Sequence, residues 1–155
     1  MAVALSTLVA TLLIGVGAVA DDGDSIHAGG VYYRLWGMDA PEFTQTCARP
    51  NGARWACGRA ASVAMRDMIA GQDVRCQARG KDRYRRTVAV CGTDAIPDLG
   101  AEMVRRGLAL DYKRYSGGAY AGQERAARRN RRPIWNTCRQ ASNGNVDDQP
   151  CFSRA

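Results

Sequence analysis

Histidine is nearly absent from this chain, and its cysteines do not form the close pairs that bind zinc. The 155 residues include one histidine, His27, and six cysteines, none of them in a C-x-x-C arrangement. Structural zinc sites are built from clusters of these two residue types. The sequence therefore argues against a zinc domain, and His27 is expected to form hydrogen bonds at the surface.

Charged side chains are absent from residues 1–20. Val3 to Val19 is mostly apolar, and Ala18-Val-Ala20 has the small-x-small form of a signal-peptidase site. The segment lacks the usual basic start of a signal peptide, and its length is close to that of a membrane-spanning helix. We expect a signal peptide or an uncleaved N-terminal anchor, and hence a secreted, periplasmic or membrane-anchored protein.

Acidic residues are fewer than basic ones. The chain has 22 Lys and Arg against 15 Asp and Glu, for a net charge of +7 and a pI of about 9.4. Such a balance favours an anionic partner, which includes nucleic acid, an anionic membrane surface and a cell-wall polymer. The length fits one domain with a core of its own.

An even number of cysteines behind an apolar N-terminus indicates disulfides formed in an oxidising compartment. Buried free thiols in a cytosolic protein are the alternative. Six cysteines allow many pairings, and the sequence alone does not choose among them. We predict the three local pairs Cys47–Cys57, Cys76–Cys91 and Cys138–Cys151.

Apolar periodicity predicts an α+β domain in which short strands come first and helices close the chain. The predicted strands cover residues 25–28, 31–36, 74–78, 87–91 and 108–112, and the predicted helices cover residues 57–70, 98–107 and 119–132. Asp98 is the expected N-cap of the second helix, and Pro133 ends the third.

The stretch from Arg34 to Glu42 organises the rest of the chain. It begins as a strand, Gly37 interrupts the alternation, and Asp39 and Glu42 follow in a bend stiffened by Pro41. One arginine and two acids within nine residues suit the joint binding of a metal ion and a phosphate. Taken alone, such a turn is more often a surface salt bridge.

A predicted hairpin adds a third acid to this stretch. Gly29-Gly30 is a two-residue turn signal, which pairs Ala28 with Val31. Counting back along the hairpin places Asp24 opposite Leu35 and close to Arg34.

Three segments in this order resemble the staphylococcal nuclease (thermonuclease) family: Asp22-Gly-Asp-Ser25, Arg34 to Glu42, and Asp82-Arg-Tyr-Arg-Arg86. The resemblance runs from about Asp22 to Trp135. It implies a five-stranded OB-fold β-barrel with three α-helices in residues 21–137. The polar sequence that follows predicts a tail in residues 138–155. The resemblance also implies a calcium-dependent endonuclease that hydrolyses DNA and RNA with little sequence preference and leaves 3′-phosphate ends.

The resemblance assigns roles to individual residues. The Ca²⁺ ligands would be Asp24, Asp39 and the carbonyl of Ala40, because calcium prefers hard oxygen ligands. Glu42 would be the general base. The phosphate would be gripped by Arg34 and Arg86, and the rest of the substrate would be contacted by Lys113 and Tyr115.

The chain departs from the family pattern at three places. Arg85 stands where the family has glycine, and Lys113 stands where it has a tyrosine. The family also has a strand leading into Asp22, which cleavage after Ala20 would remove. Either cleavage falls earlier, near Gly15 or Gly17, or the segment stays attached, or the first strand is short.

Two other functions are compatible with the composition. One is a catalytically silent nucleic-acid-binding OB-fold module, which family-like domains become when they lose the acids; here the acids are present. The other is a disulfide-stapled basic protein acting on membranes or cell-wall polymers, which leaves the acids and arginines unexplained. For the nuclease we expect a monomer without an obligate protein partner, in contact with a membrane only if residues 1–20 are uncleaved.

Overall fold

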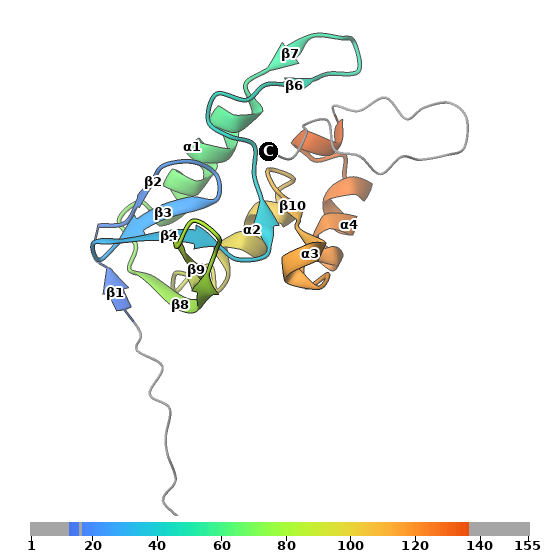
Figure 1. Ribbon diagram of the computed structural model, residues 1–155. Helices are drawn as coiled ribbons and strands as arrows, with labels where there is room; N and C mark the ends of the chain where they lie inside the picture. Colours follow the sequence, from blue (N-terminus) through green and yellow to red (C-terminus); the bar gives the residue numbers. More distant parts are fainter. Residues whose placement is uncertain (1–12, 16, 137–155) are drawn as a thin grey trace, which may run out of the picture.

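The computed structural model describes residues 13–15 and 17–136 (Figure 1). In chain order its elements are β1 (Leu13–Gly15), β2 (Val19–Ala20), β3 (Ser25–Ala28), β4 (Val31–Leu35), β5 (Met38–Asp39), β6 (Cys47–Ala48), β7 (Arg54–Trp55), α1 (Cys57–Ile69), β8 (Val74–Lys81), β9 (Thr87–Gly92), α2 (Leu99–Arg105), β10 (Leu110–Asp111), α3 (Lys113–Ser116), α4 (Ala121–Arg129) and the 3₁₀ helix η1 (Pro133–Asn136).

Six strands form one mixed sheet in the order β1-β8-β9-β4-β3-β2. Strands β4 and β9 run parallel, and the other neighbours are antiparallel. The edge strands β1 and β2 follow one another in the sequence, separated by a short break that contains Gly17 at φ 84°. Within the described residues no ladder joins these two edges. The α+β class is confirmed, whereas the five-stranded closed OB-fold barrel is not, because the described sheet has six strands and stays open between β1 and β2.

The β3–β4 hairpin has the predicted register. Gly29 and Gly30 adopt φ values of 57° and 75°, the left-handed conformations that a tight two-residue hairpin turn requires. Ala28 pairs with Val31. The amide of Leu35 donates to the carbonyl of Asp24 at 2.8 Å, so the hairpin carries Asp24 to the end of β4 as expected.

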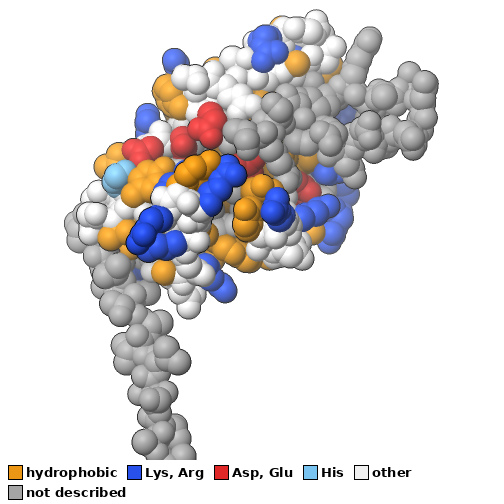
Figure 2. All heavy atoms as spheres, viewed as in Figure 1, with side chains coloured by type: hydrophobic (Ala, Val, Ile, Leu, Met, Phe, Trp, Pro, Cys, Tyr) orange, Lys and Arg blue, Asp and Glu red, His pale blue; other side chains and the backbone are white. Residues whose placement is uncertain are grey.

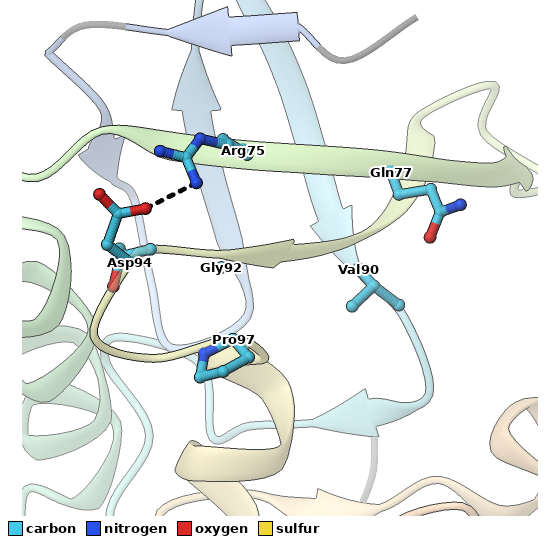
Figure 3. A pocket seen from close by; sticks show the side chains of 7 residues that line it. Arg75, Gln77, Val90, Gly92, Asp94 and Pro97 are labelled. Atoms are coloured by element: carbon cyan, nitrogen blue, oxygen red, sulfur yellow. Dashed lines mark ion pairs between the residues drawn. The ribbon is translucent and has the colours of Figure 1, made fainter. Parts of the chain in front are cut away.

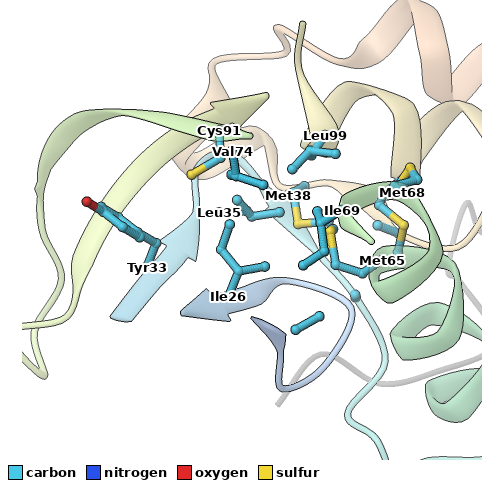
Figure 4. Packing of buried hydrophobic residues seen from close by; sticks show 14 of the residues in the cluster. Ile26, Tyr33, Leu35, Met38, Met65, Met68, Ile69, Val74, Cys91 and Leu99 are labelled. Carbon is cyan, nitrogen blue, oxygen red and sulfur yellow. The ribbon is translucent and has the colours of Figure 1, made fainter. Parts of the chain in front are cut away.

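The main core lies between the sheet and helices α1 and α2. One face of α1 is buried through Ala61, Met65, Met68 and Ile69. Figure 4 shows the side chains of Met65 and Ile69 directed toward apolar residues of the sheet and of α2. Burying a side chain of this size contributes about 1.5–3 kcal/mol, so this packing holds the strands that carry the site.

Four α-helices are present in the described part of the chain, whereas the resemblance implied three. The additional helix is the single turn α3, which ends at Gly117 in the left-handed conformation (φ 63°). Helix α2 begins as predicted, because the carboxylate of Asp98 accepts a hydrogen bond from the amide of Ala101 at 3.0 Å.

Two of the three predicted disulfides are confirmed. Cys47 is bonded to Cys57, and Cys76 is bonded to Cys91 across the β8–β9 pair, where the two residues are register partners. The third predicted pair, Cys138–Cys151, lies outside the described residues.

Part of residues 1–20 belongs to the sheet. Ala20 at the end of β2 is only 1% exposed, and its carbonyl accepts a hydrogen bond from Arg66 Nε at 3.2 Å. None of the helices in the described ranges is long and apolar enough to cross a membrane. Whether residues 1–20 are removed stays a prediction, and removal after Ala20 would take both β1 and β2 from the sheet.

Candidate active site

Asp24, Arg34 and Asp39 meet where the β3–β4 hairpin reaches β5. Arg34 Nη1 lies 2.5 Å from Asp24 Oδ1, and Arg34 Nη2 lies 3.1 Å from Asp39 Oδ1. One guanidinium therefore bridges two carboxylates that are 15 residues apart in the sequence. Arg34 is able to do this because Ser25 faces it across the hairpin, immediately after Asp24.

The carboxyl of Asp24 is buried and held from several directions. Its Oδ2 accepts a hydrogen bond from the amide of Ala40 at 3.2 Å, and its Oδ1 accepts one from Ser25 Oγ at 3.1 Å. Burial raises the pKa of Asp24 to about 8 despite the opposing charge of Arg34, and nearby Asp22 adds to the rise. A buried carboxyl with this pKa favours additional positive charge beside it.

Asp39 is positioned by the pairing of β5 with β10. Asp39 is opposite Leu110 in this pair, and the amide of Tyr112 donates to the carbonyl of Gly37 at 2.9 Å. Gly37 has a φ of 70°, and a β-carbon there would lie 3.0 Å from the side chain of Ser116. Glycine thus lets α3 approach the acids closely.

Glu42 has an exposed side chain on a fixed backbone. Its amide donates to Gln45 Oε1 at 3.1 Å, and its carbonyl accepts from the amide of Gln45 at 2.8 Å. Pro41 before it is fully buried. The carboxylate of Glu42 can therefore face solvent while the peptide that carries it stays in place.

A cleft of about 810 Å³ collects most of the predicted site. Arg34, Asp39, Glu42, Arg86 and Tyr115 all line it. Asp24 lies behind Arg34 and does not line the cleft, and Ala40 and Lys113 are also outside its lining. Figure 2 shows acidic side chains gathered on one part of this face, with basic and apolar side chains around them.

Arg86 reaches the cleft from the turn between β8 and β9. Its Nε lies 2.6 Å from Asp82 Oδ2, while Asp82 Oδ1 accepts the amides of Tyr84 and Arg86 at 2.9 Å each. Burial works to lower the pKa of Arg86, but the hydrogen bond and charge of Asp82 outweigh it and raise that pKa. Arg85 adopts a φ of 65°, so the turn keeps at this position the left-handed backbone that glycine favours.

Several cleft residues had no assigned role in the sequence analysis. They are Trp36, Arg79, Tyr84, Tyr112 and Arg114. The guanidinium of Arg114 lies 5.9 Å from the ring centre of Tyr115, and that of Arg79 lies 5.2 Å from the ring of Trp36. The alternation of aromatic and basic residues in Tyr112-Lys-Arg-Tyr115 was a signal for such a surface.

The oxygen donors at the acids suit calcium in chemical type. Asp24 and Asp39 place carboxylate oxygens at the two Nη atoms of one guanidinium, and Ala40, next to Asp39, has a backbone carbonyl. No group of three or more His, Cys, Asp or Glu side chains that could hold a metal occurs among the residues described. Any calcium here would therefore rely on few protein ligands, together with water. His27 is apart from this centre and pairs at the surface with Asp21 at 3.0 Å, as expected for it.

A second hollow of about 350 Å³ lies elsewhere on strands β8 and β9 (Figure 3). Its charged groups, Arg75 and Asp94, form an ion pair of 2.6 Å across its edge. Because these charges are already paired and none of the predicted site residues is nearby, this hollow has no part in the site.

Comparisons with known proteins agree with the motif analysis. The family model described as "Staphylococcal nuclease homologue" matches residues 32–137. A succinoglycan biosynthesis protein of Rhizobium meliloti is 33% identical over 124 residues, which are 79% of this chain and 64% of that protein. An uncharacterized endonuclease of Haemophilus influenzae is 36% identical over 83 residues, which are 54% of this chain and 40% of that protein. The chain thus spans less than two thirds of either relative.

Proposed function

This chain belongs to the family of staphylococcal nuclease homologues, and we propose that it is a calcium-dependent endonuclease. It hydrolyses phosphodiester bonds in DNA and RNA with little sequence preference and leaves 3′-phosphate ends. The observation that carries the proposal is the bridge from Arg34 to Asp24 and Asp39, located at a cleft shared with Glu42 and Arg86.

Arg34 and Arg86 bind the scissile phosphate. Each guanidinium stays charged and presents paired donors that match phosphate oxygens. Both are held in orientation by carboxylates, Arg34 by Asp24 and Asp39, and Arg86 by Asp82. Preorganised donors of this kind stabilise the charge that develops in the transition state.

Asp24, Asp39 and the carbonyl of Ala40 would hold calcium. When bound, the ion supplies positive charge next to the scissile phosphate. The raised pKa of Asp24 supports this role, because the buried carboxylate gains from a second cation beside it.

Glu42 is the general base that orients and deprotonates the attacking water. Its exposed position in the cleft gives water access to the carboxylate, and its backbone hydrogen bonds with Gln45 hold it there. Tyr115 and Arg114 contact the nucleotide chain by stacking and by charge, and Lys113 adds charge from outside the cleft lining.

Digestion of supercoiled plasmid and of a single-stranded RNA tests this function. Both should be cut with calcium present, and cutting should stop in excess chelator. End analysis should find 3′-phosphates. Binding without cutting under both conditions would instead identify a silent nucleic-acid-binding module, and full activity in chelator would contradict the metal site. The disulfides support a secreted or periplasmic location.

A further inference from the structure

We propose that Gln45, the Cys47–Cys57 disulfide and Gly58 form a clamp that positions Glu42 for catalysis. These four residues are called the Glu42 clamp below, and they act as positioning residues through Glu42 without touching substrate. The inference rests on the proposed function, in which Glu42 is the general base.

Gln45 contacts both backbone polar groups of Glu42. Its side-chain oxygen accepts the amide of Glu42 at 3.1 Å, and its own amide donates to the carbonyl of Glu42 at 2.8 Å. Pro41 restrains the backbone just before Glu42, but Glu42 itself is an exposed loop residue, a class with high backbone mobility. These two bonds fix the turn from which the Glu42 side chain projects.

Gln45 is in turn attached to the start of α1. The amide of Gly58 donates to the carbonyl of Gln45 at 3.1 Å. Helix α1 has no side-chain cap at Ala56, so this carbonyl satisfies one of the amides that the first turn leaves unpaired. Cys57 Sγ also lies 3.6 Å from the same carbonyl, a packing contact because a disulfide sulfur carries no proton.

Gly58 lets the Glu42 peptide lie directly on the helix. A β-carbon at Gly58 would lie 1.7 Å from the carbonyl oxygen of Glu42, which is far inside contact distance. Any other residue at this position would push Glu42 away from α1. The fit therefore links the identity of Gly58 to the placement of the general base.

The disulfide anchors the clamp in a small apolar core. Cys47 and Cys57 are fully buried and pack with Leu110 and Ile134. The bond closes the base of the β6–β7 hairpin, which Figure 1 shows extending beyond the start of α1. Cys47 lies five residues after Glu42. The covalent bond therefore separates the segment that carries Glu42 from movements of the β6–β7 hairpin.

If the Cys47–Cys57 disulfide only stabilised the fold, its loss would lower the fraction of folded enzyme and leave the kcat of the folded molecules unchanged. The clamp predicts instead that kcat itself falls. Replacing Cys47 and Cys57 together by Ala should lower kcat on the order of 10- to 100-fold, the effect of a displaced catalytic group, with little change in KM. The matched control is the same double replacement at Cys76 and Cys91, measured at a temperature where both variants are folded; it should keep the parent kcat.

The decisive comparison combines the clamp with Glu42. In a Glu42→Gln background the Cys47→Ala, Cys57→Ala change should cost no further turnover, because the group that the clamp positions is already lost. An equal loss in both backgrounds would overturn the proposal, since the disulfide would then act through something else.

A readout that does not depend on activity separates this inference from the proposed function. Amide hydrogen exchange at Glu42 should become about tenfold faster in Gln45→Ala, which removes the acceptor of this amide, and in Gly58→Ala, which displaces the Glu42 carbonyl and the turn that holds the amide. Alanine is the better helix former, so its effect at Gly58 must come from the clash with the backbone of Glu42 and Phe43. Gly122→Ala in α4, where a β-carbon meets nothing nearer than 4.0 Å, is the control.

The possible results are distinct. Unchanged exchange at Glu42 in both variants would overturn the clamp even if the enzyme is a nuclease. Faster exchange together with full turnover by Glu42→Gln would show that the clamp exists but that the general-base assignment is wrong, which also overturns the catalytic part of this inference.

Discussion

Arg34 Nη1 lies 2.5 Å from the carboxylate of Asp24, a residue that is only 2% exposed. This pair joins Arg34, the charged residue of β4, to an acid whose pKa stays raised because burial outweighs the charge of Arg34. The same guanidinium extends to Asp39, so the two acids proposed to hold calcium are also the ones that orient Arg34.

Asp24→Asn should change how stability depends on pH in the presence of chelator. The folded-state pKa of Asp24 is about 8, against an ordinary value of 3.8, so the stability from its protonated form is complete below pH 4 and is lost as pH rises toward 8. Asn cannot ionise and escapes this loss. The free energy of unfolding of the variant relative to the parent should therefore rise between pH 5 and pH 8 in urea titrations. A pH-independent difference would contradict the raised pKa.

Glu42→Gln should lower turnover by roughly 100-fold or more while leaving substrate affinity nearly intact. The amide keeps the size of the side chain and removes its basicity. Single-turnover cleavage and equilibrium binding at one fixed salt concentration measure the two effects separately. Cleavage at the parent rate would mean that water is activated without Glu42.

Arg34→Lys should also lower turnover, although the charge is kept. Lysine has a single donor group in place of the guanidinium fork, so it cannot bridge Asp24 and Asp39 as the structure has it or grip phosphate oxygens in pairs. The salt dependence of binding should stay close to that of the parent, because it reports the number of charges. Single-turnover rates equal to those of the parent would show that the guanidinium of Arg34 does not stabilise the transition state.

Tyr115→Ala and Arg114→Ala should weaken binding of a short single-stranded oligonucleotide more than Lys113→Ala does. The first two side chains line the cleft and the third does not. Loss of a stacking ring costs about 1–3 kcal/mol per base, and loss of Arg114 should in addition reduce the salt dependence by about one charge. Fluorescence anisotropy at several salt concentrations measures both. The strongest loss at Lys113 would place the substrate on the other face of α3.

Features that depend on neighbours in the chain could be predicted from the sequence. The Gly29-Gly30 turn determined the register of the hairpin, because a two-residue turn allows one pairing. That register places Asp24 beside the end of β4. The Asp98 cap and the bond between Cys76 and Cys91 follow from equally local geometry. The segments Asp22 to Ser25, Arg34 to Glu42 and Asp82 to Arg86, taken together and in this order, predicted the family that the family model confirms over residues 32–137.

Tertiary structure alone decided how distant segments meet at the cleft. The β5–β10 pairing brings α3 beside Asp39, and the carbonyl of Gln45 caps a helix that begins 12 residues later. Neither contact has a periodic signature, because each joins irregular backbone whose hydrogen-bond partners are settled only when the elements pack. The family resemblance implied a closed barrel, but the structure has two separate edge strands, β1 and β2, on either side of Gly17. The sequence could not show this, because closure of a barrel depends on hydrogen bonds between the two edge strands and not on the apolar pattern of any one strand.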